Sequence, residues 1–219
     1  MLPYPVFLDV MGQPCVVVGA GAVGQRKAQS LLSAGAKVTV VAPEATARVE
    51  LLAVEGKLQW LAEAYQPNHL DGARLVFAAT DDSELNQRVA ADARTRGALV
   101  NVAEPSEAGD FAVPATVRRG EICIAVSTGG ASPSLAKKLR EQIELVVGEE
   151  YAALVELLGE MRMTLEKHVK AQNKRQQVYE AILASDALAL LRDGKADEAR
   201  RRCEEIVKEF SARTAEEPA

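Results

Sequence analysis

Three glycines are spaced so that the chain could hold a dinucleotide. Gly19, Gly21 and Gly24 follow the apolar run at residues 15–18 with the G-x-G-x-x-G spacing of dinucleotide-binding turns. In such a turn the first glycine permits a tight bend, the second lets a pyrophosphate approach the backbone, and the third lets the next helix pack close to the strand. The N-terminus of that helix offers free N–H groups to the phosphates. The pattern predicts a dinucleotide site, and a plain glycine turn at the start of a parallel-sheet domain is the alternative.

A carboxylate follows at the distance where such sites often hold the adenosine ribose. Glu44 lies twenty positions beyond Gly24, after the strand expected at residues 37–41, and an acid there can accept hydrogen bonds from the ribose hydroxyls. Its charge would repel the 2′-phosphate of NADP, although Arg48 lies one helical turn onward. The sequence therefore predicts NAD as the cofactor.

The elements that must position these residues alternate in type along the first half of the chain. Short β-branched runs without polar alternation predict buried strands, because helices cover both faces of a parallel sheet. We expect such strands at residues 15–18, 37–41, 58–61, 75–79 and 99–102, a short edge strand at 6–10, and helices at 22–34, 44–55 and 84–96. This order predicts an α/β fold with a Rossmann-like, doubly wound parallel sheet.

The pattern changes after Asp110. We expect two antiparallel strands at residues 111–117 and 121–127, joined by a turn at residues 118–120. Ser132 suits the N-cap position of a helix at residues 134–147, because its hydroxyl can accept a backbone N–H, and Pro133 suits the first helical position. From Glu149 onward the composition is helical, with interruptions expected near Gly159 and at residues 185–186 and 193–194.

Composition argues against several classes of function. A net charge of -5 opposes non-specific nucleic-acid binding, which depends on clustered positive charge. Cys15, Cys123 and Cys203 are far apart and odd in number, which opposes a disulfide framework and favours a reducing compartment. No apolar run reaches membrane-spanning length, and the start of the chain does not look like a signal sequence. We therefore expect a soluble, cytoplasmic protein that binds neither nucleic acid nor a membrane.

Four blocks of sequence carry a family resemblance. They are GAGAVGQRKAQSLLSAGAKVTVVAP, AATDDSELNQRVAADA, NVAEPSEAGDFAVPATVRRG and AVSTGGASPSLAKKLREQIE. In this order and spacing, residues 3–162 resemble the precorrin-2 dehydrogenase and sirohydrochlorin ferrochelatase family, which forms the dehydrogenase-chelatase region of siroheme synthase. The glycine block is shared with many enzymes, whereas the last two blocks are much more specific.

The resemblance implies NAD-dependent oxidation of precorrin-2 to sirohydrochlorin and, in bifunctional members, insertion of ferrous iron to form siroheme. It also implies a homodimer interlocked through the middle segment. We expect this chain to lack the methyltransferase domain that is fused in some relatives. The predicted domains are an NAD-binding Rossmann domain at residues 1–112, a dimerisation and substrate-binding segment at 113–148, and a C-terminal helical domain at 149–219.

Glu104 and Asp110 are the predicted catalytic residues. Dehydrogenation needs a hydride acceptor and a group that removes or relays a proton, and Glu104 follows the strand at 99–102 at the sheet edge where doubly wound folds place ligands. The family usually has an aspartate at this position, so the longer side chain could keep the chemistry with altered reach or impair one of the two activities. The alternatives are a solvated loop acid for Glu104 and a turn-forming residue for Asp110.

The resemblance extends to the cofactor side of the site. Thr80 and Asn101, each at the end of a strand, resemble family positions where a hydroxyl and an amide could bond the nicotinamide ribose or carboxamide, with loop capping as the alternative. The predicted cofactor-binding residues are Gly19, Gly21, Ala22, Val23, Gly24, Pro43, Glu44, Thr80 and Asn101. Arg26 and Lys27 are expected to face solvent.

Residues 127–132 suit a substrate with many carboxylates. The glycines expose N–H groups, the hydroxyls add donors, and the next helix directs its positive end toward the segment. Two arginines could add bidentate contacts, whereas the charges at 137, 138 and 140 fit a solvated helix face better. The predicted substrate-binding residues are Arg118, Arg119, Ser127, Thr128, Gly129, Gly130 and Ser132.

No metal site is predicted. His69 and His168 are the only histidines; neither belongs to a cluster of metal-ligand spacing, and both are expected on the surface. Ferrous iron could still be a substrate, because a carboxylate could accept the pyrrole protons while the tetrapyrrole supplies the ligands.

Two other functions stay open. A regulatory NAD(H)-sensing module would need the glycine turn but neither Glu104 nor residues 127–132. An unrelated small-molecule dehydrogenase would carry a Ser-Tyr-Lys or catalytic-histidine signature, and none is recognisable in the sequence.

Overall fold

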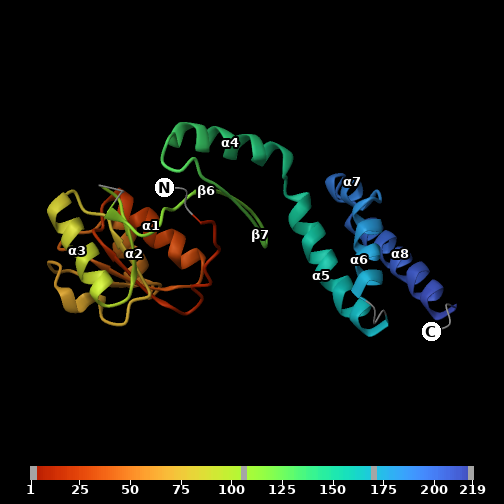
Figure 1. Ribbon diagram of the computed structural model, residues 1–219, viewed down its shortest axis with the longest axis horizontal. Coiled ribbons are helices and arrows are strands. Elements are labelled where there is room, and N and C mark those ends of the chain that lie inside the picture. Colours follow the sequence, from red (N-terminus) through yellow and green to blue (C-terminus); the bar gives the residue numbers. More distant parts are fainter. Residues whose placement is uncertain (1–3, 105–107, 169–171, 217–219) are drawn as a thin grey trace. The chain divides into compact units, whose positions relative to one another are not determined.

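The chain folds into two compact units, Met1–Val113 and Pro114–Ala219 (Figure 1). The computed structural model describes residues 4–104, 108–168 and 172–216. The boundary between the units falls beside the predicted end of the Rossmann domain. The finer division of the second unit, into a substrate and dimerisation segment and a helical domain, stays a prediction.

The first unit is built on a parallel sheet of five strands in the order β3-β2-β1-β4-β5. Its strands are β1 (Pro14–Val18), β2 (Lys37–Val41), β3 (Gln59–Leu61), β4 (Leu75–Ala78) and β5 (Leu99–Val102), and its helices are α1 (Ala22–Ser33), α2 (Ala47–Val54), the 3-10 helix η1 (Pro67–Leu70) and α3 (Ser83–Thr95). The direction of the strand order reverses between β1 and β4, and in doubly wound sheets ligands bind at such a switch point, outside the carboxyl ends of the strands. The predicted Rossmann-like fold is confirmed.

Helices cover both faces of this sheet. Cys15 and Val17 of β1 pack in the same core cluster as residues of α1 and α2, whereas Val16 and Val18 pack with residues of α3 and η1. Successive side chains of a strand point to opposite faces, so a strand that is buried on both sides carries apolar residues throughout. This arrangement explains the unbroken apolar runs in the sequence.

Two local predictions about the first unit were wrong. Residues 6–10 form no strand, and β3 and β5 form the edges of the sheet. Val6, Phe7 and Leu8 are exposed, so apolar packing does not hold these side chains against the sheet. The second helix begins at Ala47 rather than at residue 44, because the hydroxyl of Thr46 caps it by accepting the N–H of Val49.

The second unit starts with an antiparallel hairpin and continues in helices. Its strands are β6 (Ala115–Arg119) and β7 (Ile122–Val126), and its helices are α4 (Pro133–Val146), α5 (Glu150–His168), α6 (Gln172–Leu183), α7 (Ala187–Arg192) and α8 (Ala196–Glu216). The hairpin turn lies at Gly120 and Glu121, later than predicted, because Gly120 adopts the positive φ of 55° that the turn needs. Ser132 caps α4 as predicted. No helix within the described ranges combines the length and the apolar character needed to cross a membrane.

The helices from α5 to α8 share an apolar core. It includes Leu157, Met161 and Leu165 of α5 together with Val178, Ile182, Ala199 and Cys203 of the following helices. The predicted interruption near Gly159 was wrong, since α5 continues through it. A helical glycine costs only about 1 kcal/mol relative to alanine, and the buried residues on either side offset that cost. The predicted breaks at residues 185–186 and 193–194 are confirmed by the ends of α6 and α7.

Candidate functional site

The three glycines of the first turn differ in what surrounds them. Gly19 has a φ of 101°, and a Cβ there would overlap the carbonyl of Ala79; a Cβ on Gly24 would overlap the carbonyl of Gly19. A Cβ on Gly21 would meet no heavy atom within 4 Å. The protein therefore fills the space beside the first and third glycines and leaves the space beside the second open, as a site for an approaching pyrophosphate requires.

The start of α1 is also open to a ligand. Gly21 occupies its N-cap position, so no side chain caps the first turn, and Ala22 and Val23 are exposed. Uncapped N–H groups at a helix N-terminus attract anions. The predicted phosphate-binding residues therefore lie at one exposed helix terminus.

The loop that carries Pro43 and Glu44 is tied to this turn. The N–H of Thr46 donates to the carbonyl of Ala20 over 3.2 Å, and its hydroxyl donates to Oε1 of Gln25 over 2.7 Å. Glu44 is exposed. The carboxylate predicted for the ribose thus follows β2 in a loop that is hydrogen-bonded to the glycine turn.

Thr80 lies in the loop after β4, where it makes several short hydrogen bonds. Its hydroxyl donates to the carbonyl of Asp82, 3.1 Å away, or to Oδ1 of Asn86, 2.8 Å away, and its N–H donates to the same Oδ1 over 3.1 Å. These are the contacts of a loop cap, and a cofactor contact by Thr80 stays a prediction.

Asn101 and Asp110 both fasten the segment that follows β5. Asn101 is buried and donates from Nδ2 to the carbonyl of Phe111 over 2.8 Å. Asp110 accepts from Nε and an Nη atom of Arg94 at 2.8 and 2.7 Å, and from the N–H of Val100 at 3.0 Å. Both carboxylate oxygens of Asp110 are therefore engaged within the protein, and its catalytic role stays a prediction.

Glu104 lies just beyond the carboxyl end of β5, with its side chain exposed. Its carbonyl accepts a hydrogen bond of 3.2 Å from Nδ2 of Asn86 on α3. The backbone at Glu104 is thereby fixed, while the carboxylate stays accessible to a substrate. Sequence reasoning missed Asn86; its signal is an amide in line with the buried Val89, Ala90 and Ala93 of the same helix.

The predicted substrate residues lie in the second unit. Thr128 and Ser132 are bonded to each other, since the Thr128 hydroxyl donates to the Ser132 carbonyl and accepts the Ser132 N–H, at 3.0 and 3.1 Å. Ser127 accepts the N–H of Gly129 over 3.2 Å, and Gly129 and Gly130 both have positive φ. These bonds shape the loop from within. Binding of substrate carboxylates there stays a prediction.

The two arginines of β6 lie on opposite faces of the hairpin, and their contacts with substrate stay a prediction. Neighbouring side chains of a strand point to opposite faces, and Arg119 shares its face with the buried Val117, while Arg118 is exposed on the other. Nε of Arg119 lies 3.2 Å from a carboxylate oxygen of Glu149, without hydrogen-bond geometry. Arg118 is therefore the more exposed of the two side chains.

The side chains of Lys27 and His69 are less exposed to solvent than predicted. Lys27 is half-buried, with its Nζ 5.6 Å from the centre of the Phe77 ring, and burial, followed by the neighbouring Arg26, lowers the pKa of its ammonium. The side chain of His69 is 8% exposed, because it contacts Glu63 over 3.1 Å and accepts the N–H of Gln66. Both predictions of a solvent-facing side chain were wrong, and the side chain of His168 lies outside the described residues.

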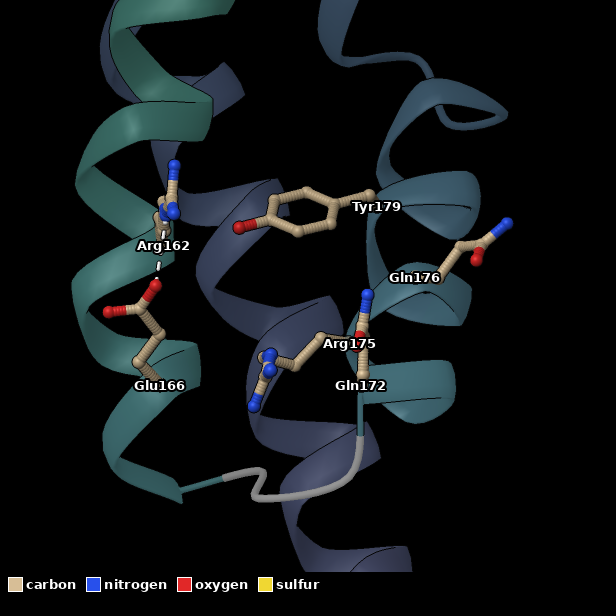
Figure 2. A pocket seen from close by; sticks show the side chains of 6 residues that line it. All are labelled: Arg162, Glu166, Gln172, Arg175, Gln176 and Tyr179. Carbon is tan, nitrogen blue, oxygen red and sulfur yellow. Dashed lines mark hydrogen bonds and ion pairs between the residues drawn. The ribbon is translucent and has the colours of Figure 1, made fainter.

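A polar pocket lies between α5 and α6, apart from the predicted site residues (Figure 2). It is lined by Arg162, Glu166, Gln172, Arg175, Gln176 and Tyr179. Arg162 pairs with Glu166 over 2.9 Å, and the Tyr179 ring points from α6 toward α5. Within the described ranges, no group of three or more His, Cys, Asp or Glu side chains could hold a metal ion.

Three family models match the chain in succession. Residues 6–115 match an NAD(P)-binding family, residues 119–144 match the central part of sirohaem biosynthesis proteins, and residues 150–206 match the dimerisation region of sirohaem synthase. The first model alone covers half of the chain, and the three follow one another in chain order.

Curated relatives and a solved structure agree with these models. The chain is 39% identical over 201 residues to the siroheme synthase of Chromobacterium violaceum and 38% identical over 197 residues to that of Methylococcus capsulatus. The two matches include 92% and 90% of this chain, respectively, but only 42% of each siroheme synthase. The structure of SirC, a precorrin-2 dehydrogenase, matches with a TM-score of 0.76 and 27% identity over 93% of this chain and all of that one. The chain therefore belongs to the siroheme synthase family, of which it carries the NAD(P)-binding, central and dimerisation regions in order.

Proposed function

We propose that the chain oxidises precorrin-2 to sirohydrochlorin with NAD⁺. The observation that carries the proposal is the likeness to SirC, which extends over the whole of that precorrin-2 dehydrogenase. The chain spans less than half of the siroheme synthases it resembles, so the activity is assigned to this region and not to a complete siroheme synthase. Sequence identity above 30% to those proteins supports the same pathway.

The first unit fits a nicotinamide dinucleotide. Gly21 leaves room for the pyrophosphate, and the uncapped N-terminus of α1 favours its charge. Glu44 is exposed after β2, where it would bond the adenosine ribose and repel a 2′-phosphate, so we infer a preference for NAD⁺ over NADP⁺. The bound cofactor supplies a hydride acceptor.

Glu104 would complete the reaction by moving a proton. Oxidation of precorrin-2 removes a hydride and a proton, so a base must accept the proton that the dinucleotide does not take. Glu104 follows β5 at the carboxyl edge of the sheet, the edge at which the glycine turn follows β1. Its exposed carboxylate can reach a substrate placed there, and its fixed backbone limits where that carboxylate projects.

The direct test is turnover with defined substrates. Protein incubated with precorrin-2 and NAD⁺ is expected to form sirohydrochlorin and NADH in equal amounts, measured by absorbance, and to bind NADP⁺ more weakly than NAD⁺. A rate no higher than that of precorrin-2 and NAD⁺ without protein, under conditions where SirC is active, would contradict the proposal.

Ferrous iron is a second proposed substrate. The tetrapyrrole nitrogens would bind the metal while a carboxylate such as Glu104 accepts the pyrrole protons, so the reaction requires no stable protein-metal site. Addition of Fe²⁺ to sirohydrochlorin, followed by the siroheme spectrum, tests this activity separately. Insertion no faster than the spontaneous reaction would restrict the chain to dehydrogenation.

We also propose a homodimer formed through the second unit. Residues 150–206 match a sirohaem synthase dimerisation region, and α4 exposes Leu135, Leu139, Leu145 and Val146. The spacing of Leu135, Leu139 and Val146 places them along one side of the helix, and apolar patches of this kind are typical of interaction surfaces. Light scattering of the purified protein is expected to give twice the chain mass of 23.4 kDa; a mass of one chain across a range of concentrations would overturn the proposal.

A further inference from the structure

Asn86 is a buried amide that joins two loops of the candidate site. It lies on α3 with 1% of its surface exposed. Its Oδ1 accepts the N–H of Thr80 at 3.1 Å and the hydroxyl of Thr80 at 2.8 Å. Its Nδ2 donates to the carbonyl of Thr80 at 3.0 Å and to the carbonyl of Glu104 at 3.2 Å.

These four bonds fix the orientation of the amide. An asparagine side chain has two acceptor positions on its oxygen and two N–H donors. Three of these bond backbone groups of Thr80 and Glu104, and the fourth faces the Thr80 hydroxyl, which donates either to Asn86 or to the carbonyl of Asp82. The N–H of Thr80 can only donate and the two carbonyls can only accept, so exchanging the oxygen and nitrogen of the amide would lose bonds to these groups. Asn86 can therefore make all its hydrogen bonds in only one arrangement of the loop at Thr80 and the loop at Glu104.

The position of Asn86 on its helix shows that packing alone does not account for it. Val89, Ala90 and Ala93 are buried on the same helix, and an apolar side chain would continue that face. Burying a polar group is unfavourable unless it is hydrogen-bonded. The amide stabilises the structure only through the bonds that hold Thr80 and Glu104.

We propose that Asn86 is a positioning residue for the dehydrogenation, an inference that rests on the proposed function. It joins the loop after β4, which adjoins the glycine turn through the close approach of Gly19 and Ala79, to the backbone that carries Glu104. The Glu104 carboxylate thereby projects from a fixed point relative to the cofactor side of the site. Misplacement of a reacting group by about 1 Å can lower turnover about a hundredfold.

The test is a double-mutant cycle on turnover. Asn86→Ala is expected to lower kcat of the folded enzyme by about tenfold to a hundredfold, with a much smaller change in NAD⁺ affinity. In a Glu104→Ala background it is expected to change the residual kcat by less than about twofold, because a residue that acts through Glu104 has no further effect once Glu104 is gone. Circular dichroism and thermal unfolding set a temperature at which every variant is folded.

Two further variants keep the test decisive. Asn86→Asp keeps the shape of the side chain and the acceptors for Thr80 but loses both donors, so it is expected to lower kcat as the alanine variant does. Tyr65→Phe is the matched control. It removes a hydrogen bond of 2.9 Å from the Tyr65 hydroxyl to Asp92, which lies on α3 as Asn86 does. It is expected to lower the unfolding midpoint and to leave kcat unchanged.

The outcomes separate the two proposals. A wild-type kcat in folded Asn86→Ala and Asn86→Asp would show that Asn86 acts only on stability. The same fractional loss of kcat with and without Glu104 would show that Asn86 does not act through Glu104. Either result would overturn the proposal. No turnover of precorrin-2 by the wild-type protein would instead refute the proposed function, and the role of Asn86 would fall with it.

Discussion

Replacement of Glu104 by alanine is expected to lower kcat for precorrin-2 oxidation by about 10² to 10⁴, the usual contribution of a positioned acid or base. NAD⁺ affinity is expected to stay close to that of the wild type, because the glycine turn and Glu44 are unchanged. The side chain is exposed, so its removal leaves no cavity and costs little stability. Steady-state kinetics, cofactor binding by fluorescence and thermal unfolding measure the three quantities.

An isosteric amide and a shorter acid serve as controls for Glu104. Glu104→Gln keeps the shape and removes the base, and it is expected to lose as much turnover as the alanine variant. Glu104→Asp restores the acid that the family usually carries at this position, and it is expected to retain dehydrogenase activity. If the chain were a regulatory NAD(H)-sensing module, none of these substitutions would affect its function. Unchanged turnover of precorrin-2 in Glu104→Ala would contradict the catalytic role of Glu104.

Gly21→Ala is expected to weaken NAD⁺ binding by at least about tenfold, which corresponds to about 1.4 kcal/mol. Gly21 has a φ of -70°, which alanine adopts freely, and its Cβ would project into open space. The methyl group would therefore meet only the approaching pyrophosphate. The unfolding midpoint without cofactor is expected to stay the same or rise slightly, since alanine restricts the unfolded chain.

Gly24→Ala is the matched control for that substitution. Its methyl group would overlap the carbonyl of Gly19, so stability is expected to fall by about 1 to 3 kcal/mol, as in other overpacked sites. The two glycines thus separate an effect on the ligand from an effect on the fold. Normal NAD⁺ affinity in Gly21→Ala would show that the pyrophosphate does not approach the backbone at this turn.

Much of the fold could be predicted because its signals are local. Strands that are buried on both faces consist of apolar runs, and caps such as Ser132 act on neighbouring N–H groups. Two predictions failed because they depend on distant partners. Residues 6–10 carry strand-forming side chains, but the edges of the sheet are formed by β3 and β5. Gly159 resembles a helix break, but buried residues on both sides hold α5 together.

The site could be predicted only in part for the same reason. Spacing identifies Gly19, Gly21 and Gly24, and the family resemblance identifies Glu104. The contacts of Asp110 with Arg94, sixteen positions away, depend on how the chain returns along β5. Asn86 bonds to Thr80 and to Glu104, eighteen positions away. Local patterns do not encode such pairs, although an amide on a buried helix face is a signal that a search for buried polar groups would find.

The close approach of Gly19 to Ala79 helps to fix the distance between the glycine turn and Glu104 in the candidate site. Backbone touches backbone there, and hydrogen bonds of about 3 Å continue from Thr80 through Asn86 to Glu104. No flexible side chain intervenes except a buried amide with all its bonds made. The separation between the dinucleotide turn and the acid is thus preorganised before any ligand arrives. Under the proposed function, a flexible tetrapyrrole must adapt to this spacing. Discrimination among substrates would then depend on which macrocycles can place their reacting carbon between the cofactor and the acid at this fixed separation.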